Sequence, residues 1–392
     1  MNEFVETVKD SVGYEILWIL LGLLLGELIK YGINWSDKKL KKRKLHKALK
    51  NHNNIVLEGK DIISLDHADP TYEMHDIFVR ESGKKLFIDC PEEYKEIIRL
   101  HDPDFVFSQN TSFNRSSDFN DLAEITGIAN LPGLIDKHSR VAVGHFIAKL
   151  ENGHTIFNGK KYRVFNIRRK RVADGEENAS LKLDLFETDY FTHHVFRSIY
   201  KELKAEGHPI SKIEKMEEIH RYSPFLTSFG INAFILLENH AESEIVFAKR
   251  SKYLNTGTEE SLWHVSMNEG LTETDREGKE VSLIKCLHRG LREELGIREE
   301  HHKYIIDERF MDLFLETNRF EIGLTSFVRL DMRRNQLNSL YDISKDGELE
   351  TDGIVSIPFK QKELSRFVKG HSLTNAAKYT LKMLLARRKF ML

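Results

Sequence analysis

The sequence is poor in cysteine: its 392 residues include only Cys90 and Cys286. Two thiols cannot form a disulfide framework or a four-cysteine zinc site. Small domains stabilised by several disulfides or by a four-cysteine zinc ion are therefore excluded. Such a low cysteine content is typical of folded parts that lie in a reducing, cytosolic setting. Cys286 falls within a predicted helix, where we expect a buried structural thiol.

The chain also lacks an excess of charge of either sign. Its net charge is −2, with 40% hydrophobic and 31% charged residues, which is a globular composition without a field that would attract a nucleic-acid polymer. The basic run at residues 168–171, the one such run between residues 54 and 222, is interpreted as the solvated end of a strand rather than a nucleic-acid contact. Because 392 residues exceed one ordinary core, we expect two globular units and a smaller segment.

Residues 12–35 contain the one long apolar stretch, with an unbroken run at residues 16–26. A spanning helix needs roughly 20 mainly apolar residues, and eight Lys and Arg follow between Lys38 and Lys50. By the positive-inside rule this flank stays in the cytoplasm. A cleaved signal peptide would have its positive charge before the apolar run, and an interfacial helix would have a polar face. We therefore predict a single-pass anchor in the cell inner membrane with the following domains in the cytoplasm.

Three residues of the predicted span favour self-association. Gly22 and Gly26 have the spacing that lets two helices approach closely, and Glu27 is costly in lipid unless it faces a partner or water. The alternative is that Glu27 reaches the nearby headgroups. We expect a homo-oligomer.

Residues 54–222 carry no assignable catalytic motif and read as a mixed α/β region. Alternation predicts short antiparallel strands at residues 141–150, 154–157 and 162–167, with Asn-Gly turns at 152–153 and 158–159. Helical spacing predicts a helix at residues 190–203, and residues 108–121 read as a loop. The pairs His193-His194 and His301-His302 are not expected to share a metal, because adjacent helical residues point about 100° apart.

The most informative segment is Arg289–Ile297, R-G-L-R-E-E-L-G-I. It ends a predicted helix whose apolar stripe runs through Val281, Ile284, Leu287 (or Leu283), Leu291 and Leu295, and Gly296 is placed to cap it in the left-handed conformation. Glu293 and Glu294 leave the stripe, with Arg289 one turn behind Glu293 as an ion-pair partner. Clustered carboxylates suit Mg²⁺, which prefers oxygen ligands and bridges to phosphates.

This segment resembles the second half of the Nudix box, R-E-U-x-E-E-x-G-U with U a bulky aliphatic residue, at six of seven specified positions. The flanks are similar to that family: strands at residues 230–237, 244–250, 310–315, 320–330 and 353–358, a tryptophan strand at Trp263–Gly270, and a C-terminal helix. The resemblance implies an α+β chain with a C-terminal Nudix-fold α/β/α sandwich at residues 223–392. Before it lie an anchor at residues 1–35, a basic linker at 36–53 and the mixed middle region at 54–222.

The box is degenerate at two places. Gly290 stands where the family has a glutamate, and Met267-Asn268 stand where two glycines are usual, before a long loop at residues 271–279. A mid-helix glycine costs about 1 kcal/mol relative to alanine, so we expect something to approach the backbone closely at Gly290, either a ligand or a packed neighbour. Glu269, Glu273 or Glu280 could replace the missing acid, and Glu348 or Glu350 could add a ligand or act as base.

The order of an anchor, a middle region and a degenerate Nudix domain resembles the SMODS-associated Nudix (TM–Nudix) effectors of CBASS anti-phage systems, which are encoded beside CD-NTases. This resemblance implies binding of a cyclic (oligo)nucleotide second messenger, followed by disruption of the inner membrane and abortive infection. The alternative is a membrane-tethered, Mg²⁺-dependent hydrolase of nucleoside diphosphate derivatives, with Glu293 and Glu294 as catalytic metal ligands. In either case we expect the ligand to contact Trp263, Glu269, Arg289, Gly290, Glu293 and Glu294.

Overall fold

The computed structural model describes residues 61–65, 76–154, 156–174, 176–239, 242–251, 261–278, 280–344 and 351–391. The predicted anchor with Gly22, Gly26 and Glu27 and the basic linker lie outside these residues, as do Glu348 and Glu350. Within the described ranges no helix has the length and apolar character that a membrane span requires.

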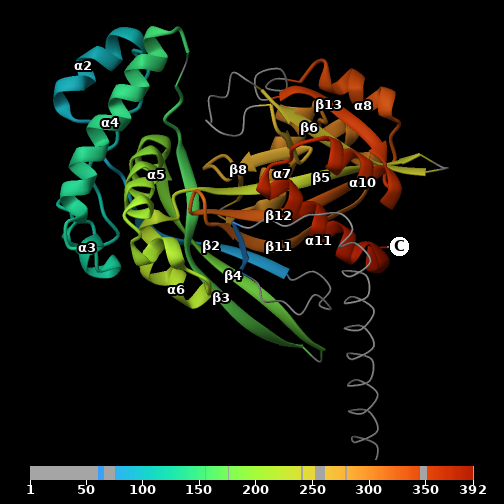
Figure 1. The fold of residues 1–392 in the computed structure, drawn as a ribbon, viewed down its shortest axis with the longest axis horizontal. Coiled ribbons are helices and arrows are strands. Elements are labelled where there is room, and N and C mark those ends of the chain that lie inside the picture. Colours follow the sequence, from blue (N-terminus) through green and yellow to red (C-terminus); the bar gives the residue numbers. More distant parts are fainter. Residues whose placement is uncertain are drawn as a thin grey trace, which may run out of the picture.

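The N-terminal half of the described chain is built on a three-stranded sheet with helices beside it (Figure 1). The strand order is β2-β4-β3, with β2 parallel and β3 antiparallel to β4. The strands are β2 (Asp76–Lys85), β3 (Lys160–Asp174) and β4 (Glu176–Asp189). The helices are α2 (Glu92–His101), α3 (Asn120–Thr126), α4 (Leu131–Glu151), α5 (Tyr190–Ala205) and α6 (Met216–Ile219), with 3-10 turns at Pro209–Lys212 and His220–Phe225.

The strand prediction for residues 141–150 is wrong, because these residues lie inside the 21-residue helix α4. The buried residues of α4 recur at helical spacing, as Ile135, Ser139, Ala142, Val143, Phe146 and Leu150 do. Over a segment this short, the apolar positions of a helix resemble the alternation of a strand. Only a longer window distinguishes the helical period from the strand period. Residues 154–157 contain no described strand either, whereas residues 162–167 lie in β3 as predicted. The helix predicted at residues 190–203 is confirmed by α5, and the loop predicted at 108–121 runs to the start of α3.

The C-terminal half is built on a larger sheet with the order β1-β11-β12-β5-β6-β13 (Figure 1). Strands β5 and β12 are parallel, and the other neighbours along this order are antiparallel. Two short strands pair with it, β7 with β6 and β8 with β5. The strands are β1 (Ile62–Ser64), β5 (Phe229–Asn239), β6 (Glu242–Arg250), β7 (Trp263–His264), β8 (Met267–Gly270), β11 (Ile305–Glu316), β12 (Glu321–Leu330) and β13 (Thr351–Pro358). These confirm the strands predicted for this half.

Helices cover both faces of the larger sheet. One face shares a core with α7 (Leu283–Leu295), through residues such as Leu287, Leu291, Ile231 and Leu324. The opposite face carries Phe234, Phe247 and Phe327, which pack against α10 (Gln361–Gly370) and α11 (Asn375–Met391). The remaining elements are α8 (Arg334–Tyr341), a 3-10 turn at Glu299–Tyr304, and the small hairpin of β9 (Arg276–Glu277) and β10 (Glu280–Val281). The architecture is therefore the mixed α/β, helix–sheet–helix arrangement that the sequence predicts.

The two halves share one continuous hydrophobic core. Phe196 of α5 lies 5.2 Å from Phe225 between ring centroids, and Tyr200 lies 5.1 Å from Phe320 at the start of the larger sheet. Strand β1 precedes the three-stranded sheet in sequence, yet it pairs with β11. The domain division at residues 222–223 stays a prediction, and the two sides of it are packed as one body.

Candidate functional site

Helix α7 carries the Nudix-like segment and has well-defined ends. Ser282 caps the N-terminus by accepting a hydrogen bond from the backbone N–H of Lys285. Gly296 ends the helix at φ 71°, as predicted, and a Cβ there would collide with the carbonyl oxygen of Leu340. The buried stripe uses Leu283 rather than Ile284, whose side chain is 37% exposed, and Val281 precedes the helix in β10. Cys286 is fully buried, as expected.

Arg289 organises the carboxylates around this helix. Its Nε and one terminal nitrogen bind the two oxygens of Asp275 at 2.8 and 2.9 Å, and it also donates to the carbonyl oxygen of Gly270 at 2.7 Å. The other terminal nitrogen lies 2.9 Å from Glu269 Oε1 and 3.3 Å from Glu293 Oε2. Burial opposes the charged form of Arg289, but the hydrogen bonds that it donates to Asp275 and the charge of Glu269 raise its pKa. The predicted Arg289–Glu293 pair is thus one part of a larger ionic network.

Glu269 and Glu293 are held in this network. Burial raises the pKa of Glu269 despite the neighbouring Arg289. Glu269 also accepts a hydrogen bond from the N–H of Gly270, while Glu293 has a second cationic neighbour in Arg292 at 2.9 Å. Their oxygens therefore face guanidinium and N–H donors, which compete with a metal ion for the same lone pairs.

Gly290 lies directly beneath strand β8. A Cβ on Gly290 would overlap Met267 Sδ and would lie 2.8 Å from Glu269 Cβ, closer than packed carbon atoms approach. Of the two explanations for a glycine here, the structure favours the packed neighbour. The space that a third box carboxylate would occupy is filled by the side chains of β8.

Glu294 is 5% exposed and has a different role from Glu293. Its two carboxylate oxygens lie 3.0 and 3.2 Å from the backbone nitrogen of Asn268, which donates to them. Across the described residues, no group of three or more Asp, Glu, His or Cys side chains could hold a metal ion. The described carboxylates do not fit a Mg²⁺ site as they are arranged, and Mg²⁺ binding stays a prediction tied to the hydrolase alternative.

A cavity adjoins Glu294 at the N-terminal ends of the parallel strands β5 and β12. We call it the His264 cavity; it consists of two adjoining parts of about 70 and 20 Å³ that share Arg250, His264 and Asn268. The smaller part reaches Glu294 and Thr351. Besides the three shared residues, the larger part is lined by polar, charged and apolar residues: Ser228, Gly230, Asn232, Phe314, Glu316, Arg319, Glu321, Ile322, Gly323 and Ala376. Since one water needs about 10–15 Å³ by this measure, the larger part has room for a phosphate-sized group.

His264 has one unsatisfied ring nitrogen in this cavity. Its Nδ1 lies 2.5 Å from Thr374 Oγ1, whereas its Nε2 is buried and has no hydrogen-bond partner among the described residues. Burial, followed by the charges of Arg250 and Arg319, lowers the pKa of His264 well below 6.5, so the ring is neutral at pH 7. A buried nitrogen without a partner costs about 1–3 kcal/mol, and a ligand atom in the cavity would remove this cost.

The structure brings together some of the predicted site residues and separates others. Glu269, Arg289, Gly290, Glu293 and Glu294 cluster where α7 meets β8. Trp263 lies apart from them, because it packs against Phe367 and His371 at centroid distances of 5.3 and 5.6 Å. The prediction that Trp263 contacts the ligand therefore gains no support from its position.

Sequence reasoning missed Asp275, His264 and Arg319. Asp275 lies in the long loop after β8, and no periodicity marks it. His264 follows Trp263, so the alternation of a strand places its side chain opposite to that of Trp263. The two adjacent histidine pairs have separate partners: His193 binds Thr227 Oγ1 at 3.1 Å, and His302 packs on His288.

No family model and no curated protein matches this chain. Solved structures that are similar to it include the NUDIX domain of Shewanella oneidensis NrtR complexed with ADP ribose, with a TM-score of 0.29 and 11% identity over 42% of this chain and 88% of that one. A mutT/nudix family protein from Listeria innocua has a TM-score of 0.27 and 13% identity over 42% and 94% of the chains. A bifunctional NMN adenylyltransferase/ADP ribose pyrophosphatase from Francisella tularensis has a TM-score of 0.30 and 13% identity over 50% and 46%.

These structural neighbours are Nudix-domain proteins. Their TM-scores lie below 0.5, so the likeness carries no argument about ligand or reaction. The functional reasoning below rests on α7, the Arg289 network and the His264 cavity.

Proposed function

We propose that this chain is a membrane-anchored nucleotide sensor, in which the His264 cavity binds a cyclic (oligo)nucleotide second messenger and the N-terminal segment disrupts the inner membrane. This role corresponds to that of a CBASS effector that causes abortive infection. Two observations together support the proposal. The carboxylates of the box already have partners in Arg289 and Asn268, which leaves them poorly placed to bind a metal ion. The adjoining cavity has an unsatisfied polar group, because His264 Nε2 lacks a partner among the described residues.

The His264 cavity offers polar groups that suit part of a nucleotide. Arg250 and Arg319 line it together with the carboxylates of Glu316 and Glu321, so a bound phosphate would have to share the guanidinium groups with these acids. His264 offers a neutral ring nitrogen and Asn232 offers an amide. The cavity volume accommodates one phosphate-sized group, so the rest of the nucleotide must lie outside it. A ligand with several phosphates and a large body is compatible with this geometry.

The membrane part of the proposal rests on residues 12–35 and on the basic residues after them. Gly22, Gly26 and Glu27 favour an oligomer of this span, whose two states would bind the ligand differently. A hydrolase of soluble nucleotides has no evident need for such a segment.

The alternative function is Mg²⁺-dependent hydrolysis of a nucleoside diphosphate derivative. It requires Glu293 and Glu294 to leave their present partners and a third ligand to come from elsewhere, such as Glu348 or Glu350. The sensor explains the present hydrogen bonds without such a rearrangement, which is why we prefer it.

Calorimetry on the full chain in lipid nanodiscs tests the binding step. We expect a cyclic dinucleotide or cyclic trinucleotide to bind, and His264→Phe to weaken that binding about 10-fold, which corresponds to the loss of one hydrogen bond. Trp263→Phe is the matched control, since Trp263 adjoins His264 in β7 but faces Phe367, and it should leave the affinity unchanged. Equal effects of the two variants would contradict the assignment of the cavity.

Two further experiments separate sensor from hydrolase. With Mg²⁺ and nucleoside diphosphate derivatives the sensor releases no product, whereas turnover that Glu294→Gln abolishes would refute it. In cells, toxicity should require co-expression of a cyclic-nucleotide synthase and should disappear when residues 1–35 are deleted. Toxicity without the synthase would count against ligand control.

A further inference from the structure

A second cavity lies in the N-terminal half, between helices α4 and α5. We call it the α4–α5 groove; its volume is about 410 Å³, within the range of small-molecule sites. One wall comes from one face of α4, the other from α5, and His154 follows α4 at one end. The lining residues are Val141, Ala142, His145, Ala148, Lys149, Asn152, His154, His194, Arg197, Ser198 and Lys201. Figure 1 shows α4 and α5 side by side, on the opposite side of the molecule from β13 and α10.

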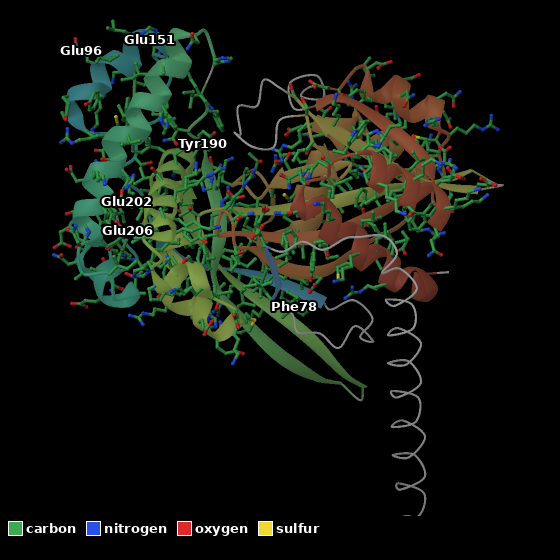
Figure 2. All side chains as sticks on the ribbon, in the orientation of Figure 1. Phe78, Glu96, Glu151, Tyr190, Glu202 and Glu206 are labelled. Carbon is green, nitrogen blue, oxygen red and sulfur yellow. The ribbon has the colours of Figure 1, made fainter. Side chains whose placement is uncertain are left out.

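The lining of this groove is basic on both walls. Lys149 comes from α4, Arg197 and Lys201 come from α5, and neither Asp nor Glu is among the lining residues. Nearby cations outside the groove do have carboxylate partners, as Lys137 has Glu202 at 2.6 Å. Glu202 and Glu206 lie toward the C-terminal end of α5 (Figure 2), where Glu202 binds both Lys137 and His138. Three positive charges thus converge on one hollow without a carboxylate lining it.

Arg197 shows that the groove is incompletely satisfied. Its Nε is buried and has no hydrogen-bond acceptor within the described part of the chain. A guanidinium N–H that is shielded from water without an acceptor is costly, and an oxyanion supplies the acceptor that fits it. The exposed outer part of the groove leaves access for such a ligand, because His145, Asn152 and His154 line its rim and are exposed.

The positive charges around the groove contribute to lowered pKa values of two of its side chains. Burial, followed by the charges of Arg197, Lys149, His145 and Lys201, lowers the pKa of His194 to about 3. Burial and the charge of Arg197, with Arg319 beyond it, also lower the pKa of Lys201. Tyr190 and Phe146 hold the His194 ring edge-on at centroid distances of 4.5 and 5.3 Å, so it forms a fixed neutral part of the wall.

We propose that the α4–α5 groove is a second ligand site, separate from the His264 cavity, that binds a phosphate-bearing small molecule through Arg197, Lys201 and Lys149. The charge, the acceptor that Arg197 Nε lacks and the volume all point to an oxyanion of about nucleotide size. A free phosphate ester and a phospholipid headgroup share this chemistry. The site stands whether or not the His264 cavity binds a second messenger.

Binding of inorganic pyrophosphate to the full chain tests the site. The chain is placed in phosphatidylcholine nanodiscs, and calorimetry at low salt follows the titration in a His264→Phe background that impairs the other cavity. We expect saturable binding of one pyrophosphate, which Arg197→Gln and Lys149→Gln each weaken about 10-fold or more, as for loss of a charge-assisted hydrogen bond. Lys149 is partly exposed on α4 and has no buried, unpartnered atom among the described residues, unlike Arg197 with its Nε, so the Lys149 variant provides a second test of the site that does not disturb this buried atom.

Lys204→Gln is the matched control. Lys204 lies on α5, carries the same charge and bonds to Asn318 instead of lining the groove, so its loss should leave pyrophosphate binding unchanged. A parallel arm replaces pyrophosphate with vesicles that contain phosphatidylglycerol. Binding of either probe that the groove variants weaken supports the site, and the probe that binds shows whether the ligand is a free phosphate compound or a lipid headgroup. Binding that the groove variants leave intact, or that Lys204→Gln weakens equally, overturns the proposal, as does no binding of either probe.

Discussion

Substitution of Gly290 measures how tightly strand β8 packs on helix α7. In Gly290→Ala the helix gains about 1 kcal/mol of intrinsic propensity, but the new methyl group overlaps Met267 Sδ and lies 2.8 Å from Glu269 Cβ. Methionine can move at small cost, whereas Glu269 Cβ is fixed to the strand backbone. Overpacking of this kind costs about 1–3 kcal/mol, so we expect a net loss of up to about 2 kcal/mol.

Gly144→Ala in α4 provides the matched comparison. Gly144 is also inside a helix, and a Cβ there would meet nothing within 4 Å, so only the gain of propensity should remain. The difference between the two variants isolates the packing term and should be about 1–3 kcal/mol, or several degrees in melting temperature. Thermal unfolding of the full chain in detergent, followed by circular dichroism, measures it. Equal stabilisation by both variants would refute the close packing at Gly290 and reopen the space for a ligand.

Three other predictions follow from the same contacts. Asp275→Asn should destabilise the fold by about 1–3 kcal/mol in thermal unfolding, because Arg289 loses its bidentate charged partner but keeps Glu269; an unchanged melting temperature would exclude a structural role for the pair. The pKa of His194 is about 3 in the folded chain and about 6.5 when unfolded, so the unfolded state binds the extra proton first and stability falls as pH falls below 6.5. Between pH 7 and pH 5 the wild type should lose up to about 2 kcal/mol more than His194→Phe, as compared by denaturation at both pH values. Cys286 is buried with its pKa raised well above 9.0, so a thiol reagent at pH 8 should modify it only after denaturation, and rapid native modification would contradict the burial.

Local patterns were enough to predict the elements whose buried faces repeat over many residues. Helix α5 was predicted from apolar spacing alone, and β5, β6, β11 and β12 from strand-like segments in the order that the Nudix resemblance implies. Residues 141–150 were assigned wrongly because ten residues sample too few turns of a helix that extends over 21. The pairing of β1 with β11 spans about 250 residues of sequence, and no local signal specifies such a partner.

The contacts of the candidate site also divide into those that local sequence spacing predicts and those that it does not. The Arg289–Glu293 pair follows from i,i+4 spacing and the cap at Gly296 from its place at the end of the stripe. Asp275 joins Arg289 only because the loop after β8 folds back over the helix, and His264 joins Arg250 only because β7 pairs with β6. These contacts depend on tertiary structure, so the His264 cavity was missed even where the motif beside it was recognised.

The loop at residues 271–278 connects the Arg289 network to the three-stranded sheet. Through Asp275 it binds Arg289, and through the carbonyl oxygen of Leu271 it accepts hydrogen bonds from Tyr162 N–H and from Arg163, both in β3. Arg163 is buried, and burial lowers its pKa to about 10; its Nε and one terminal nitrogen donate to main-chain carbonyl oxygens rather than to a carboxylate. A shift of α7 on ligand binding would strain these hydrogen bonds unless β3 moved with it. Since packed interfaces of this kind resist gradual deformation, the loop provides a direct physical connection between the candidate site and the N-terminal half.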